Sequence, residues 1–218
     1  MEMKNMRDLR SVAEDTAHYL GTELQLDTKE TAAIRFGLES LLDFIINLGV
    51  IIGVALWLEI MPYVLAVLVP SSLLRLVSGG AHCSTFLRCL VLSVAIMIGF
   101  GQLAAKIMIS TPLLCALIAI LVASGFYVIY KWVPADTPAK PIVSAVKRAR
   151  YRKLSYIYMA IWAVAMSVLT LWSETTSGFA FASIGGVGWQ IFSITPSGYR
   201  FVAIIEKLID KVLVLFRQ

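Results

Sequence analysis

Long apolar runs, separated by isolated charges, dominate the chain between Asp43 and Arg200. Cut at these charges, the six longest are Phe44–Leu58, Ile60–Leu74, Cys89–Ala105, Ile107–Tyr130, Leu154–Ser173 and Thr175–Tyr199. A helix needs about 20 apolar residues to cross the core of a bilayer, which is close to the length of most of these runs. The pattern therefore predicts an all-α integral membrane protein with about six hydrophobic segments.

Two of these segments contain residues that interrupt regular helices. The second has Pro62 and Pro70, which favour a kinked or re-entrant helix over a straight span. The sixth has three glycines, at positions 185, 186 and 188, followed by Pro196. These residues predict either a break in the sixth segment or close packing of its helix against neighbouring helices.

Amphipathic helices are predicted at both ends of the chain. Apolar residues recur at helical spacing within the first 20 positions, and Gly21 can end that helix. Asp27 and Glu30 have the spacing of a capping box, so a second helix is expected to begin there and to run into the first apolar segment. At the other end, Phe201–Gln218 interleaves apolar and charged positions, which is typical of a helix lying along a membrane surface.

The composition excludes an ordinary soluble domain. Hydrophobic residues make up 59% of the 218 positions and charged residues only 15%, whereas about a quarter of the residues of a soluble domain are charged. The apolar segments carry almost no internal charge, which argues against an ion pathway through the protein.

Charges gather between residues 131 and 153, and their sign predicts the topology. Seven are basic and one, Asp136, is acidic; the basic residues are Lys131, Lys140, Lys147, Arg148, Arg150, Arg152 and Lys153. Because basic loops stay on the cytoplasmic side of a membrane, we expect this loop there. Counting spans from the loop places both termini and residues 75–88 on the same side. The topology and attraction to anionic lipids explain most of these basic residues. The alternative explanation is that they bind an acidic peptide.

The chain is thus expected to form a single membrane domain of five parts. In order, these are a cytoplasmic amphipathic region (1–43), four hydrophobic segments with a reactive cluster at 75–89 (44–130), a basic cytoplasmic loop (131–153), two further hydrophobic segments (154–199) and an amphipathic tail (201–218).

The reactive cluster holds most of the histidine and cysteine of the chain. The sequence has two histidines and three cysteines, and His82, Cys83 and Cys89 lie within eight consecutive residues. Two glycines, at 79 and 80, are expected to end the preceding helix, which leaves His82 in a turn and Cys89 early in the next helix. Ser84 or Thr85 is the expected N-cap of that helix. The turn lets the imidazole approach a thiol and take its proton, which makes the sulfur a nucleophile.

Plainer interpretations of these residues remain open. Spacing alone does not choose between Cys83 and Cys89 as the nucleophile, and a cysteine beside a membrane helix is usually a small packing residue. A zinc site would need a fourth ligand, and the spacing of the three residues matches no usual zinc pattern. We therefore expect no metal and no other cofactor.

Three stretches of the sequence resemble the accessory gene regulator B family, which consists of membrane-embedded cysteine peptidases. They are Arg75-x4-Gly80-x-His82-x6-Cys89, the stretch WVPADTPAKPI at Trp132–Ile142 with the basic run after it, and GWQIFSITP at Gly188–Pro196. With the length of the chain and its amphipathic start, the resemblance covers nearly all of the sequence.

This resemblance implies a Cys–His dyad with Cys89 as nucleophile and His82 as base, supported by Arg75 and Gly80. The implied substrate is a small amphipathic quorum-sensing propeptide. Its C-terminal part is cleaved through an acyl-enzyme thioester, and the rest cyclises to a thiolactone or lactone. The resemblance also implies a place in the bacterial cell membrane, contact with membrane lipids and a homodimer, with no nucleic acid partner.

Three questions stay open at this point. Cys83 is not part of the family motif, so its contribution is undecided. Asp136 is a candidate to orient His82 only because both are expected on the cytoplasmic side. The alternative functions are a peptide transporter and a non-catalytic membrane adaptor, and an adaptor would tolerate replacement of His82 and Cys89.

Overall fold

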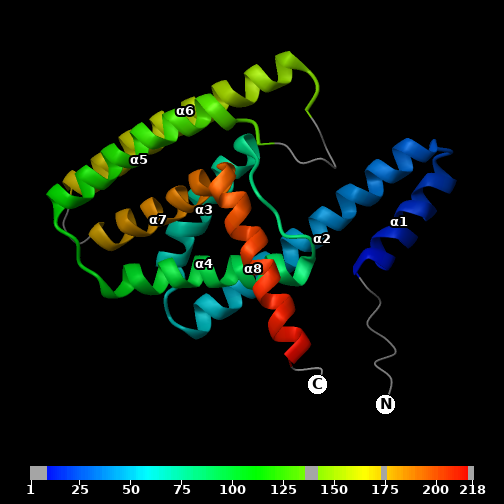
Figure 1. Cartoon of the computed structure of the whole chain (residues 1–218), viewed down its shortest axis with the longest axis horizontal. Coiled ribbons are helices and arrows are strands. Elements are labelled where there is room, and N and C mark those ends of the chain that lie inside the picture. The colour runs from blue at the N-terminus through cyan, green and yellow to red at the C-terminus, as the bar shows by residue number, and fades with distance from the viewer. Residues whose placement is uncertain (1–8, 136–141, 173–175, 216–218) are drawn as a thin grey trace. The chain divides into compact units, whose positions relative to one another are not determined.

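The computed structural model describes residues 9–135, 142–172 and 176–215, and these residues form helices and no strand, which confirms the predicted all-α class. The helices are α1 (Leu9–Glu23), α2 (Thr28–Trp57), α3 (Met61–Ser78), α4 (Phe86–Lys106), α5 (Thr111–Trp132), α6 (Ala145–Trp172), α7 (Ser177–Ile194) and α8 (Pro196–Leu215) (Figure 1). The chain divides into two compact units, one ending at Ile52 and the other beginning at Gly53, so the boundary falls inside α2.

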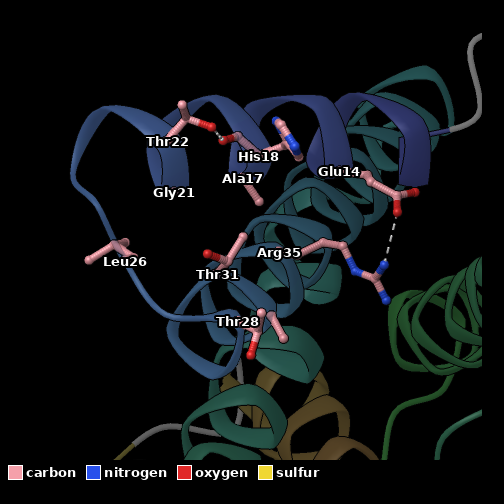
Figure 2. Close-up of a pocket in the computed structure, with 10 residues that line it drawn as sticks. Glu14, Ala17, His18, Gly21, Thr22, Leu26, Thr28, Thr31 and Arg35 are labelled. Atoms are coloured by element: carbon pink, nitrogen blue, oxygen red, sulfur yellow. Dashed lines mark hydrogen bonds and ion pairs between the residues drawn. The ribbon is translucent and has the colours of Figure 1, made fainter.

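In the first unit, α1 and the first part of α2 pack against each other as a helical hairpin. Small residues on α1 allow this packing: Ala13 and Ala17 are buried, and a Cβ atom added at Gly21 would meet the side chain of Thr31 on α2 (Figure 2). Gly21 therefore lies inside α1, which ends at Glu23, and the predicted end of the helix at Gly21 is wrong. The glycine serves close helix packing instead of helix termination.

The predicted capping box at the start of α2 is confirmed. Glu30 donates its backbone N–H to the Asp27 carboxylate at 2.7 Å, and Asp27 donates its own N–H to the Glu30 carboxylate at 3.1 Å. These bonds satisfy two N–H groups that have no partner within the helix. From there α2 runs without a break for 30 residues to Trp57, into the first apolar segment as expected.

Within the described residues, five helices, α2 to α6, are long and apolar enough to cross a membrane, which makes the chain a multi-pass membrane protein. The second predicted segment forms the single helix α3. Pro62 lies in its first turn, where a backbone N–H would have no partner within the helix, and Pro70 lies inside it. The Tyr158 hydroxyl on α6 donates a hydrogen bond to the Pro70 carbonyl at 2.6 Å. A side chain from a neighbouring helix thus bonds the backbone at the proline.

Helix α7 is the centre of the second unit, where it contacts α3, α4, α5, α6 and α8 (Figure 1). Its glycines are positions of close packing: a Cβ at Gly185 would meet the ring of Phe100, and one at Gly186 would meet the backbone of Val67. The helix continues through both glycines to Ile194. Pro196 then begins α8, so the amphipathic tail starts five residues before the predicted Phe201.

Replacing Gly186 with alanine is expected to destabilise the second unit, because the added Cβ has no room beside the α3 backbone. Overpacking of this kind costs about 1–3 kcal/mol, or a fall in melting temperature on the order of 5 °C. The matched control is Gly188→Ala, whose Cβ would meet only Leu121 at the ordinary distance of 3.8 Å. Thermal unfolding in detergent measures the difference, and equal melting temperatures for the two variants would contradict the packing described here.

Much of the predicted basic loop is helical. Lys131 belongs to the last turn of α5, and five further basic residues lie in the first turns of α6: Lys147, Arg148, Arg150, Arg152 and Lys153. Asp136 and Lys140 lie outside the described residues, so the suggestion that Asp136 orients His82 stays a prediction.

Candidate active site

A short turn between α3 and α4, residues 79–85, carries the candidate catalytic histidine; we call it the reactive turn. α3 ends at Ser78, and Gly79 and Gly80 follow with φ angles of +74° and +145°. Residues with a Cβ rarely adopt these angles, and a Cβ at Gly79 would also meet the carbonyl of Ala135. The predicted end of the helix at these glycines is therefore confirmed, and no other residue fits the first of them.

The structure brings His82, Cys83 and Cys89 together. His82 and Cys83 lie in the reactive turn, and Cys89 lies in the first turn of α4, for which Thr85 is the N-cap residue. The side chains of His82 and Cys83 lie near enough to the Cys89 thiol to act on it as hydrogen-bonding partners. His82 is exposed, whereas both cysteines are partly buried. The turn thus folds the imidazole back onto the thiol that begins the next helix.

The two thiols of the site differ in their surroundings. The hydrogen-bonding contact with Cys89 and partial burial raise the pKa of the Cys83 thiol well above its ordinary value, and the nearby carboxylate of Glu206 acts in the same direction. Cys83 is therefore protonated at neutral pH and can act as a hydrogen-bond donor to the Cys89 sulfur.

Arg75 supports the reactive turn from the last turn of α3. Its guanidinium donates to the backbone carbonyl of Ala81 at 2.7 Å and to the side-chain oxygen of Gln190 at 3.2 Å. Its charge also interacts with the sulfur of Cys89. A positive group held next to a thiol stabilises negative charge that develops there.

Gln190 on α7 is the residue that joins these parts, and it is almost fully buried at 1% exposure. Its amide nitrogen donates to the carbonyl of Gly79 at 2.7 Å and to the Ser78 hydroxyl at 3.0 Å, while its oxygen accepts from Arg75. One turn later, the backbone carbonyl of Ser193 accepts the Ala81 N–H at 3.0 Å. The sequence stretch around Gln190 carries part of the family resemblance, but the sequence alone predicts no role for Gln190. The feature that could have indicated one is a polar residue within an apolar run.

The loop after α5 completes the site. Ala135 donates its N–H to the Ser78 carbonyl at 2.8 Å and accepts the N–H of Gly80 at 3.2 Å, so the two loops pair through their backbones. Arg152 on α6 donates to the carbonyl of Val133 at 3.2 Å. Three sequence stretches that lie far apart in the chain, around residues 75–89, 132–135 and 188–196, therefore meet at one end of the second unit.

Comparison with known proteins agrees with this convergence. The family described as Accessory gene regulator B has a sequence model that matches residues 13–194, which includes the first two stretches and most of the third. The chain belongs to the accessory gene regulator B family. It therefore has a role in the accessory gene regulator system, as a multi-pass membrane protein.

Two relatives from Clostridium perfringens match nearly the full chain. The protein named "Putative AgrB-like protein 2", from strain 13 / Type A, is 26% identical over 214 residues, which cover 94% of this chain and 100% of the relative. The "Putative AgrB-like protein" of strain SM101 / Type A is 27% identical over 204 residues, which cover 89% of this chain and 94% of the relative. No solved structure matches the chain.

Proposed function

We propose that this family member is a cysteine endopeptidase that cleaves the C-terminal part of a quorum-sensing propeptide and promotes cyclisation of the remainder. The observation that carries the proposal is the approach of the His82 imidazole to the Cys89 thiol, in a turn that α3, the loop after α5 and α7 hold in place. A thiol paired with an imidazole is the minimal unit of nucleophilic cysteine catalysis.

In the first step, His82 takes the proton of the Cys89 thiol, and the sulfur attacks the carbonyl carbon of the scissile peptide bond. Arg75 lies close to that sulfur and offsets the negative charge of the thiolate. The peptide bond then breaks: His82 gives its proton to the departing amine, and the acyl part of the propeptide stays on Cys89 as a thioester. The C-terminal fragment leaves with a free amino group.

In the second step, a thiol or hydroxyl of the bound propeptide gives its proton to His82 and attacks the thioester carbonyl. The carbon–sulfur bond to Cys89 breaks, Cys89 recovers the proton, and the product is a thiolactone or lactone. Limited access of water favours this cyclisation over hydrolysis. The partial burial of Cys89 is consistent with such limited access.

The charge distribution supports a cytoplasmic site in the bacterial cell membrane. Arg152 contacts Val133 beside the pairing of Ala135 with the reactive turn, so the basic start of α6 lies at the same end of the second unit as His82. Because positive residues mark the cytoplasmic side, we propose that the reactive turn lies there, and that α7 is a sixth span, which puts both termini on that side as well. An amphipathic propeptide lying in the lipid interface would reach Cys89 from this side.

We also propose that the active form of the protein is a homodimer.

Intact-mass analysis of the purified protein mixed with its candidate propeptide tests this function. We expect an adduct with the mass of the acyl fragment on the wild-type protein and none on Cys89→Ala or His82→Ala. If a folded preparation forms no adduct and releases no C-terminal fragment, the peptidase is excluded and a non-catalytic adaptor takes its place. An adduct that survives in Cys89→Ala but disappears in Cys83→Ala would instead move the nucleophile to Cys83.

A further inference from the structure

The tail helix α8 bonds the reactive turn through one carboxylate. Glu206 accepts hydrogen bonds from both the backbone N–H and the hydroxyl of Ser84, the latter at 2.7 Å. Arg88 donates to the same Ser84 hydroxyl at 2.9 Å and lies 3.8 Å from the Glu206 carboxylate. The carboxylate and the guanidinium are mostly shielded, with side-chain exposures of 19% and 22%. Ser84, the residue next to Cys83, is thus fixed from α8.

Two contacts anchor the reactive turn, and they come from the consecutive helices α7 and α8. Ala81 is held on one side of His82 by Ser193 of α7, and Ser84 is held on the other side by Glu206 of α8. Only His82 and Cys83 lie between the anchors. The position of the imidazole relative to α4 therefore depends on both contacts.

The carboxylate is suited to this task because it is charged at neutral pH. The hydrogen bonds from Ser84 and the charge of Arg88 hold the pKa of the Glu206 carboxyl below its ordinary value. An ionised acceptor makes stronger hydrogen bonds to N–H and O–H donors than a neutral one. Glu206 can therefore affect the position of His82 through the residues of the reactive turn alone.

We propose that Glu206 is a positioning residue for the reaction: by anchoring Ser84 to α8, it keeps the His82 imidazole on the Cys89 thiol. The inference rests on the proposed function, in which His82 activates Cys89. It gives the amphipathic tail a role in the chemistry in addition to its place at the membrane surface. Glu206 touches neither the substrate nor the reacting sulfur in this scheme, so it acts only through the turn.

A double-mutant cycle on thiol reactivity tests the inference without any propeptide. The variants are Glu206→Ala, His82→Ala and the two combined, with Lys207→Ala, an exposed neighbour on α8, as the matched control. Iodoacetamide at neutral pH labels the thiols, and trypsin cleavage after Arg88 places Cys83 and Cys89 in different peptides for mass spectrometry. We expect Glu206→Ala to slow labelling of Cys89 by about tenfold, the scale of one charged hydrogen bond, and to add nothing in the His82→Ala background.

Two results would overturn the inference: unchanged labelling in Glu206→Ala, or an equal loss with and without His82, since the latter indicates a general structural effect. If Glu206→Ala does not fold, Glu206→Gln and Glu206→Asp enter the same cycle, because each keeps an oxygen that can accept from Ser84. Propeptide cleavage is measured separately, with a lower kcat and an unchanged KM expected for the Glu206 variants. If labelling shows coupling between Glu206 and His82 but the protein cleaves no propeptide, the proposed function is rejected. The positioning of His82 by Glu206 stands in that case.

Discussion

Replacing Cys89 with serine is expected to reduce propeptide cleavage by at least about 10³-fold, whereas replacing Cys83 with serine leaves the rate within about tenfold of wild type. The reason for the difference is the arrangement of the two thiols. Cys89 interacts with both the imidazole of His82 and the Cys83 side chain, and the charge of Arg75 acts on its sulfur. Cys83 keeps its proton because the contact with Cys89 and its burial raise its pKa.

Cleavage assays with a defined propeptide, together with labelling by iodoacetamide at neutral pH, measure this difference. Labelling should favour the tryptic peptide that begins at Cys89 over the one that contains Cys83. A serine at position 83 keeps a hydroxyl donor for the Cys89 sulfur, so this variant is milder than Cys83→Ala. Equal losses of cleavage for the Cys83 and Cys89 serine variants would mean that the two thiols act as one unit, contrary to the division of roles proposed above.

Replacing Gln190 with alanine should be nearly as damaging, although Gln190 contacts no substrate. The change removes three hydrogen bonds, to the Gly79 carbonyl, to the Ser78 hydroxyl and from one nitrogen of Arg75, while the Ser78 hydroxyl still donates to the Gly79 carbonyl. A typical hydrogen bond contributes about 0.5–1.5 kcal/mol to stability, and one to a charged group about 1.5–3 kcal/mol. We therefore expect a loss of several kcal/mol, shared between stability and the geometry of the reactive turn, and a fall in cleavage on the order of 10²-fold or more.

Thermal unfolding and cleavage kinetics, measured on the same preparations, separate the two parts of this loss. The control is Gln102→Ala, which removes an amide that is only partly buried and lies in an apolar stretch of α4 away from the reactive turn. Gln190→Glu is informative as well, because it keeps the acceptor for Arg75 but removes the donor to Gly79. Wild-type cleavage in Gln190→Ala would show that the turn holds its shape without this amide.

Local sequence signals predicted the parts of the structure that depend on neighbouring residues. Apolar runs predicted the membrane helices, the spacing of Asp27 and Glu30 predicted the start of α2, and the glycines at 79 and 80 predicted the end of α3. The approach of His82 to Cys89 was also predicted, because it needs only a turn between two helices. In each case a few adjacent residues determine the backbone conformation.

The remaining features depend on contacts between distant residues, which periodicity does not record. Gln190 meets Arg75 and Ser78 across more than 110 positions of sequence, and Glu206 meets Ser84 across 122. The predicted helix end at Gly21 is wrong because this glycine packs against Thr31, which lies on another helix. Glycine is compatible with both a terminus and a close contact, and only the packing distinguishes them.

The two anchors of the reactive turn give a physical reason for the length of the backbone around His82. Ala81 is bonded to α7 and Ser84 to α8, and these helices are joined through Thr195 alone. The backbone between the anchors has to cover a distance that is set by the bend between α7 and α8. An added or deleted residue at this point would break one anchor or turn the side chain of His82 away from Cys89. The two-residue interval between the anchors, which holds His82 and Cys83, therefore has a length that depends on the bend between two helices at the far end of the sequence.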